Sequence, residues 1–349
     1  MASSMKLALL SIAAIPAFSY PILSPSTILP RIDVSASKPI VPLSLRGEAP
    51  DREIGDYTIS GLEKIGEGEA GIVYKGKAKK LGLDSIDVAM KDCRGDAIPT
   101  CVKEVNVLQK LHVKISGGVP EVYASQHVKA PDTDGTLKDA FMFIMTLAEG
   151  GKLEGLTSKY AQDEKPGDKH SNLVGAWTTL EQIHDAGISH RDIFTANTAF
   201  LKKDDGETFG PIMFIDFGQA SDESKTKTPV LPSPAEEYAA PEELALIKAY
   251  REKRPIVAID PKLGDVWSFG CVTWELITGD YFCDWARDAY NRNEEEFVGI
   301  TKEKLKEGGK PVENGLAKWF AGVFATPDRR LTSKQAREQL QEIDANHLG

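Results

Sequence analysis

The feature that most constrains this chain is a polar motif near its middle, HRDIFTAN at residues 190–197, followed by DFG at residues 216–218. Each short piece occurs by chance in many proteins, but the two in this order and at this distance are a strong signal. Together they supply the carboxylate of Asp192, the amide of Asn197 and the carboxylate of Asp216. Oxygen groups of this kind bind Mg²⁺ or orient a hydroxyl nucleophile. A fold for this chain has to bring these three side chains to one site.

A second pattern, GxGxxG, is formed by Gly66, Gly68 and Gly71. Glycines allow a backbone turn to approach phosphate groups closely, with no side chain in the way. The pattern alone is weak, because dinucleotide-binding folds use it between a strand and a helix. Here Val73 begins a stretch, residues 73–78, that is typical of a strand. The order therefore favours a strand–turn–strand hairpin.

A lysine and a glutamate follow the glycines, the first at the end of a predicted strand and the second within a predicted helix. Residues 88–91 (VAMK) alternate like a strand, with Ala89 inside it and Lys91 at its end. Glu104 lies in residues 102–111, where apolar residues recur at helical spacing. Taken alone, either residue would be interpreted as an ordinary surface charge. Their order relative to the glycines and the central motif is what makes them informative.

Together these motifs resemble those of the eukaryotic-type protein kinases. Three later segments extend the resemblance: residues 238–242 (YAAPE), 265–270 (DVWSFG) and 329–332 (RRLT). They are similar to the end of the kinase activation segment, the central buried helix, and the late arginine that pairs with the glutamate of the first segment. By that resemblance, Glu242 pairs with Arg330.

The resemblance covers about residues 56–345 and implies an α+β, bilobal protein kinase fold. A small β-rich N-lobe is expected at about residues 56–148, and a larger, mostly helical C-lobe at about 149–345. The residue patterns predict ordered structure from residue 56, strands within 62–92, a helix at 102–111, strands at 119–128 and 140–147, a polar loop at 160–170, a helix at 171–187, strands at 198–203 and 211–216, and helices from 241.

The resemblance also implies the chemistry. ATP and Mg²⁺ are the expected cofactors, and the reaction is phosphoryl transfer to a Ser or Thr hydroxyl of a protein substrate. Asp192 is expected to orient that hydroxyl, Glu104 to fix Lys91 on the phosphates, and Asn197 and Asp216 to bind the metal. The residues implied to bind the nucleotide are Gly66, Gly68, Gly71, Val73, Ala89, Lys91, Met145, Thr146 and Ala148.

Four positions depart from the family pattern. Ser/Thr kinases carry a lysine two residues after the catalytic Asp, and Tyr kinases an arginine two positions later, where this chain has Phe194 and Ala196. Ala235 replaces the threonine that would bond to that lysine, and Ala199 replaces a leucine below the adenine. Losing one preorganised cation costs about 10²–10³ in rate. The alternative is therefore a pseudokinase that acts as a nucleotide-binding or scaffolding module.

The segment between Asp216 and Glu242 offers further candidates. Lys225 and Lys227 could supply the missing cation. Arg191 could receive a phosphate placed on this segment, as the family's HRD arginine often does. The possible phosphorylation sites are Ser221, Ser224, Thr226, Thr228 and Ser233.

The composition argues against other classes of protein. The chain has a net charge of −10, which would repel a phosphate backbone, so no nucleic-acid partner is expected. Nothing in the sequence indicates an oligomeric state. Cys271 lies in an apolar run and is expected in the core. The cysteines show neither CxxC spacing nor a neighbouring His cluster, which argues against zinc and against a disulfide scaffold: Cys93, Cys101, Cys271 and Cys283.

The first 50 residues differ from the rest. Lys6 precedes an apolar run at 7–15, which is too short to span a bilayer, where about 20 residues are needed. This run is similar to a secretory signal, and the Ser- and Pro-rich residues 19–46 are similar to an organelle transit segment. Together they resemble the two-part plastid-targeting leader of algae with complex plastids, with Phe18 after the cleavage site. We expect plastid (chloroplast) targeting and no transmembrane segment in the mature chain. The alternatives are the secretory route and a disordered extension of a cytoplasmic protein.

Overall fold

The computed structural model describes residues 51–131, 136–202, 209–223, 235–256, 258–281 and 283–348. The predicted leader at 1–50 lies outside these residues. So do Lys225, Lys227 and every phosphorylation candidate except Ser221. None of the helices in the described ranges combines the length and the apolar character that crossing a membrane would take.

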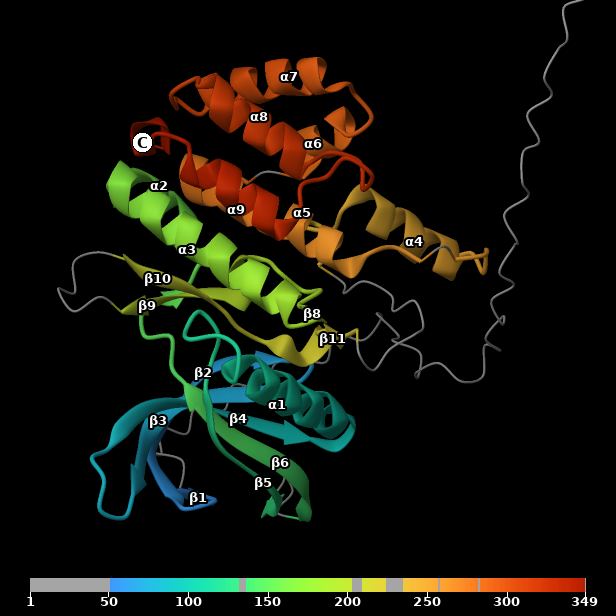
Figure 1. Ribbon diagram of the computed structural model, residues 1–349. Coiled ribbons are helices and arrows are strands. Elements are labelled where there is room, and N and C mark those ends of the chain that lie inside the picture. Colours follow the sequence, from blue (N-terminus) through green and yellow to red (C-terminus); the bar gives the residue numbers. More distant parts are fainter. Residues whose placement is uncertain are drawn as a thin grey trace, which may run out of the picture. The chain divides into compact units, whose positions relative to one another are not determined.

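The first part of the described chain is an antiparallel sheet with one helix packed on it (Figure 1). We call this part the N-lobe. Its helix is α1 (Ile98–His112). The strands, in their order across the sheet, are β1 (Arg52–Ile54), β2 (Tyr57–Gly68), β3 (Gly71–Lys80), β4 (Ile86–Arg94), β6 (Leu137–Thr146) and β5 (Val122–Pro131).

Alternation along β4 explains how the sheet holds the helix. Successive strand residues point to opposite faces. Val88 and Met90 therefore join the apolar cluster on one face of the sheet, whereas Ala89 and Cys93 join the core on the other. Val105 of α1 is buried in that second core. The residue between them on the same face, Lys91, is thus directed toward the helix.

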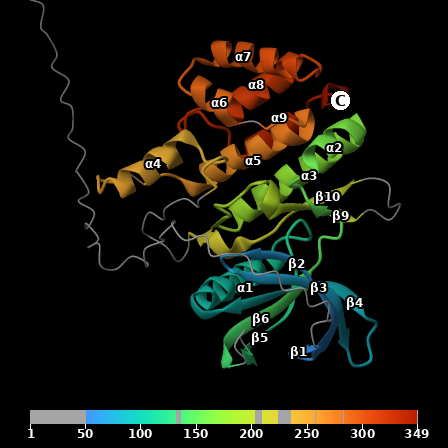
Figure 2. The same cartoon turned by 180° about the vertical axis from the view of Figure 1, so that it is seen from behind.

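The second part, the C-lobe, is mainly helical (Figure 2). Its central helix α5 (Pro261–Thr278) is buried from Gly264 to Ile277, as expected for a helix that is apolar on every side. Its small strands are β7 (Gly151–Lys152), β8 (Ile188–Ser189), β9 (Thr198–Lys202), β10 (Phe209–Phe214) and β11 (Ser221–Asp222). The other helices are α2 (Thr157–Asp163), α3 (Pro166–Asp185), α4 (Pro241–Arg251), α6 (Cys283–Ala289), α7 (Glu294–Glu307), α8 (Asn314–Val323) and α9 (Ser333–Gln341).

This arrangement confirms the predicted bilobal α+β fold, with two corrections. The polar loop predicted at 160–170 is wrong, because α2 and α3 occupy most of it. The sequence looked polar, but Tyr160 is buried in a stack on Phe200, and the buried amino group of Lys169 donates to the Ala161 carbonyl. Tertiary partners thus make polar residues part of the interior.

The cysteines are the second correction. Cys271 is buried in the core, as predicted. Cys93 and Cys101, however, form a disulfide that joins β4 to α1. Their separation of eight residues gave no hint of this pairing, which depends on how the helix lies on the strand.

The ion pair predicted between Glu242 and Arg330 is present, in the first turn of α4. The guanidinium makes two contacts to the carboxylate, one of them 3.1 Å long, and its side chain is fully buried. It also lies over the ring of Trp267 and donates to the Leu263 carbonyl at 2.9 Å. This arginine therefore joins α4 to the start of α5.

Replacing Arg330 with alanine is expected to lower the free energy of unfolding by about 3–5 kcal/mol, because the largely buried carboxylate of Glu242 would lose its cationic partner and keep only the hydrogen bond from the Tyr290 hydroxyl. Urea unfolding measures the change. The control is Arg254→Ala, which removes an exposed ion pair with Glu252 and should change stability by less than about 1 kcal/mol. Equal losses in the two variants would contradict the structural role of Arg330.

Candidate active site

A cleft of about 1080 Å³ separates the N-lobe sheet from the C-lobe. Its walls include the positions of the four departures from the family pattern, Phe194, Ala196, Ala199 and Ala235. The structure also brings every residue predicted for the catalytic, nucleotide and metal sites into this one cleft: Gly66, Gly68, Gly71, Val73, Ala89, Lys91, Glu104, Met145, Thr146, Ala148, Asp192, Asn197 and Asp216.

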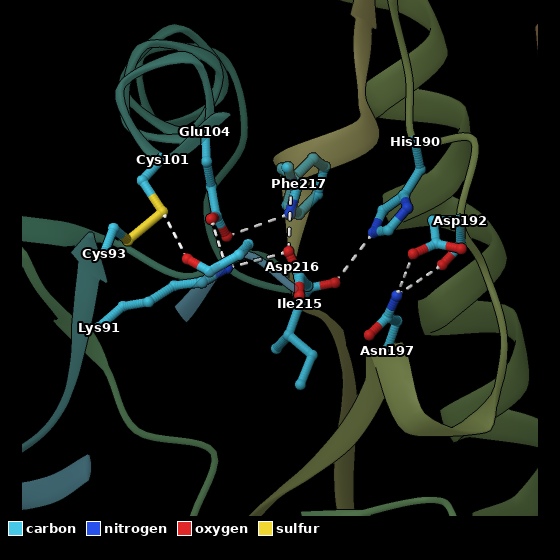
Figure 3. Close-up of polar contacts among 12 residues, drawn as sticks. Lys91, Cys93, Cys101, Glu104, His190, Asp192, Asn197, Ile215, Asp216 and Phe217 are labelled. Atoms are coloured by element: carbon cyan, nitrogen blue, oxygen red, sulfur yellow. Dashed lines mark hydrogen bonds and ion pairs between the residues drawn. A yellow bond between two sulfur atoms is a disulfide. The ribbon is translucent and has the colours of Figure 1, made fainter. Parts of the chain in front are cut away.

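Lys91 is the centre of a buried charge network on the N-lobe side of the cleft (Figure 3). Its amino group donates to Glu104 Oε2 at 2.7 Å and to Asp216 Oδ1 at 3.1 Å. The other oxygen of Glu104 accepts the backbone N–H of Phe217 at 3.2 Å. One glutamate on α1 therefore fixes both the lysine of β4 and the DFG segment.

The network shifts the protonation of its members. Burial alone lowers the pKa of Lys91, but the carboxylates of Glu104 and Asp216 outweigh it and raise that pKa above its ordinary value. Burial alone would raise the pKa of Asp216, yet Lys91 and the backbone N–H of Gly218 bring it below its ordinary value. Lys91 and Asp216 are thus held in their charged forms, as phosphate and metal binding require.

Asp192 and Asn197 lie together on the other side of the cleft. The amide nitrogen of Asn197 donates to Asp192 Oδ2 at 2.7 Å and to the Asp192 carbonyl at 3.0 Å. The backbone N–H of Ile215 donates to the Asn197 carbonyl at 3.0 Å, which joins this loop to the DFG strand. Asp192 therefore faces the cleft from a fixed position.

A buried aspartate of α5 supports the loop from behind. Asp265 accepts the backbone N–H of His190 and that of Arg191, each at 2.7 Å. Arg191 has a φ of 68°, a left-handed conformation that is uncommon for a residue with a side chain. Its guanidinium donates to the Gln219 carbonyl at 3.1 Å. Two charge-assisted hydrogen bonds hold this strained backbone in place.

The glycine motif forms the tip of the β2–β3 hairpin, which confirms the strand–turn–strand prediction. Gly71 has a φ of 132°, and a Cβ atom there would lie 2.4 Å from the carbonyl oxygen of Asp92. At Gly68 a Cβ atom would meet nothing within 4 Å. Gly71 is thus required by the fold, whereas at Gly68 the fold leaves room for a side chain and does not by itself require a glycine.

The residues fit Mg²⁺ and ATP. The described residues hold no group of three or more His, Cys, Asp or Glu side chains that could bind a metal by itself. Mg²⁺ usually needs only one or two protein ligands, with substrate phosphates supplying others. Because the Asn197 nitrogen points to Asp192, its oxygen can serve as one ligand. The carboxylate of Asp216, 41% exposed, can serve as another.

Comparison with known proteins agrees with this geometry. A family model of the protein kinase domain matches residues 59–340, which is most of the chain. The chain belongs to the protein kinase family. The domain limits predicted at residues 56 and 345 remain a prediction.

The individual relatives of this chain are distant in sequence. Serine/threonine-protein kinase KIC1 of Saccharomyces cerevisiae is 27% identical over 66% of this chain and 19% of its own length. Cyclin-dependent kinase 11A of Homo sapiens is 27% identical over 70% of this chain and 29% of its own length. Cyclin-dependent kinase G-2 of Oryza sativa subsp. japonica is 27% identical over 62% of this chain and 27% of its own length. The matched region thus spans less than a third of these relatives.

Phe194 replaces the expected lysine with an aromatic contact. Its ring lies 5.9 Å from that of Tyr238. The hydroxyl of Tyr238 donates to Glu275 at 2.7 Å and lies 3.2 Å from the Thr195 hydroxyl. The sequence analysis did not predict that Thr195, Tyr238 and Glu275 contribute to the site. The one available signal was an acidic residue inside the apolar run of α5.

Other lysines also line the cleft. Lys152 of β7 is exposed and lines the same cleft as Asp192. Among the described residues, the lysines that line it are Lys75, Lys91 and Lys152. The phosphorylation candidate Ser221 is wrong for the folded state, because it is buried in β11.

Stability should fall as pH rises from about 4.5 to 7. Burial raises the pKa of Glu275 to about 7, and that of Glu243 to about 7, so the folded protein binds these protons more tightly than the unfolded chain. Protonation of these two carboxyl groups stabilises the folded state fully below their pKa in the unfolded chain. This stabilisation is lost as the pH rises through their pKa in the folded protein. Glu275→Gln should make this fall smaller by roughly 1–3 kcal/mol, since one pKa unit is about 1.4 kcal/mol.

Urea unfolding at several pH values measures this difference. The exposed residue Glu303 gives the control, because Glu303→Gln should leave the pH dependence as it is in the unchanged chain. An unchanged slope in Glu275→Gln would contradict the assignment.

Proposed function

We propose that this chain is an active protein kinase that transfers the γ-phosphoryl group of Mg-ATP to a Ser or Thr hydroxyl of a protein substrate. The observation that supports this proposal most is the complete charge network of Lys91, Glu104 and Asp216, facing Asp192 and Asn197 across one cleft. A chain that had abandoned catalysis would be expected to lose at least one of these groups.

Each residue then has one task. When bound, Mg-ATP supplies the phosphoryl group, and ADP is the leaving group. Lys91 would hold the α and β phosphates, and Asn197 and Asp216 would hold the metal. Asp192 orients the substrate hydroxyl and accepts its proton as the new O–P bond forms. Because these groups are fixed before the substrate arrives, little reorganisation is needed in the transition state.

Phe194 and Ala235 favour a second candidate, a pseudokinase that binds nucleotide or acts as a scaffold. The loop that would meet the substrate has lost its cation and the hydroxyl beside it. The lysine of the family offsets charge on the phosphoryl group in transfer. The ring of Phe194 cannot do so, and its contact with Tyr238 fills part of that place with apolar surface.

Transfer of ³²P from labelled ATP to a general substrate protein is expected, and Asp192→Asn should abolish it. Phe194→Lys together with Ala235→Thr should raise the rate, because it restores a cation whose loss costs about 10²–10³. The uncharged control pair is Phe194→Met with Ala235→Thr, which should not raise it. Nucleotide binding with no transfer above the Asp192→Asn background would favour the pseudokinase.

We also propose that residues 1–50 direct the chain to a plastid, on the basis of the apolar run and the basic Ser- and Pro-rich tract that follows it. A fluorescent reporter fused behind residues 1–50 should enter plastids in an alga with complex plastids. Reporter in the secretory route would support that alternative. A diffuse cytosolic signal would remove the proposal.

A further inference from the structure

The disulfide Cys93–Cys101 lies beside the Lys91–Glu104 ion pair, as Figure 3 shows. Both links join the same strand, β4, to the same helix, α1. Cys93 follows Lys91 by two residues on the strand, and Cys101 precedes Glu104 by three on the helix. The two links are therefore neighbouring connections between one pair of elements.

This spacing follows from backbone geometry. Residues two apart on a strand point to the same face. Residues three apart on a helix lie on the same side. A change in how far α1 stands from β4 at the disulfide must therefore also act on the distance between Lys91 and Glu104, one helical turn away.

The sulfur of Cys101 also contacts the glycine-rich turn. Cys101 Sγ lies 3.1 Å from the carbonyl oxygen of Ala70, the residue before Gly71. A disulfide sulfur carries no hydrogen, so in the oxidised protein this is a close contact. After reduction, the thiol of Cys101 can donate to that carbonyl. The oxidation state of one residue therefore acts on both the turn and α1.

We propose that Cys93 and Cys101 form a redox-modification site for a dithiol reductant, and that its state sets the affinity of the cleft for ATP. This inference rests on the proposed nucleotide binding. A reductant thiolate would attack one sulfur, break the S–S bond and form a mixed disulfide, while the other cysteine leaves as a thiolate and takes up a proton. The second reductant thiolate would then attack the reductant sulfur of the mixed disulfide and release the remaining cysteine as a thiol. Two electrons and two protons pass to the kinase, which gains two thiols, and the reductant becomes a disulfide.

The direction follows from the geometry. The oxidised pair holds α1 against β4 and keeps Glu104 on Lys91, so the oxidised protein is the form with high ATP affinity. Both cysteines are fully buried, and a reductant reaches them only when the glycine-rich turn and α1 open. ATP bound under that turn should oppose the opening. By reciprocity, a tenfold preference of ATP for the oxidised protein corresponds to about 30 mV in the two-electron potential.

The test is Mg-ATP binding by the full chain, oxidised with a glutathione buffer or reduced with dithiothreitol. We expect the oxidised chain to bind at least about tenfold more tightly, within the usual range of coupling between sites. A chain with Cys93→Ser and Cys101→Ser should bind weakly under both conditions. The control, Cys271→Ala, changes a buried cysteine outside the Cys93–Cys101 pair and should keep the full redox response.

A second readout does not depend on variants or on catalysis. Mass spectrometry after thiol alkylation follows the appearance of the two thiols, which saturating Mg-ATP should slow. Equal ATP affinity in both states would overturn this inference and leave the proposed kinase function standing, as would finding both thiols free in the oxidised sample. Absence of ATP binding in both states would overturn the inference and the proposed function together.

Discussion

The ion pair of Lys91 with Glu104 is the interaction on which the rest of the site depends. Both side chains are almost completely removed from water, and a buried charge is tolerated only when it is paired and hydrogen-bonded. The pairing requires α1 to lie on β4 and requires Asp216 and Phe217 to approach from the C-lobe side. One electrostatic requirement thus positions two elements and the DFG segment at once.

Asp265 has the corresponding role in the C-lobe. It lies on the most buried helix of the described residues and holds two backbone N–H groups of the loop that carries Asp192. The ion pair of Arg330 with Glu242 then fixes the start of α5 to α4. The buried charged side chains of Asp265, Arg330 and Glu242 thus support the C-lobe side of the site. The cleft therefore keeps its shape before a ligand arrives.

Three of the four departures from the family pattern, Phe194, Ala196 and Ala235, lie on the side of the cleft that meets the substrate, whereas Ala199 lies on the nucleotide side. Phe194 packs on Tyr238, whose hydroxyl bonds to Glu275, so the aromatic replacement joins an existing buried network. On the nucleotide side the charges of Lys91, Glu104 and Asp216 are in place, and the Cys93–Cys101 disulfide lies beside them. The substrate side of the cleft therefore lacks the cation of the family, whereas the nucleotide side has its charges and a covalent link next to them.

The family, the bilobal fold and the catalytic, nucleotide and metal residues of the cleft could be predicted from the amino-acid sequence alone. These depend on local spacing: glycines at a turn, a lysine at a strand end, and HRD and DFG at a fixed distance. The folded structure was needed to find the helices around residues 160–170, the Tyr238–Glu275 contact and the Cys93–Cys101 bond. Tyr160 and Lys169 look polar until their partners bury them. Two cysteines eight residues apart can bond only because α1 folds back onto β4, and that contact is made by the whole core.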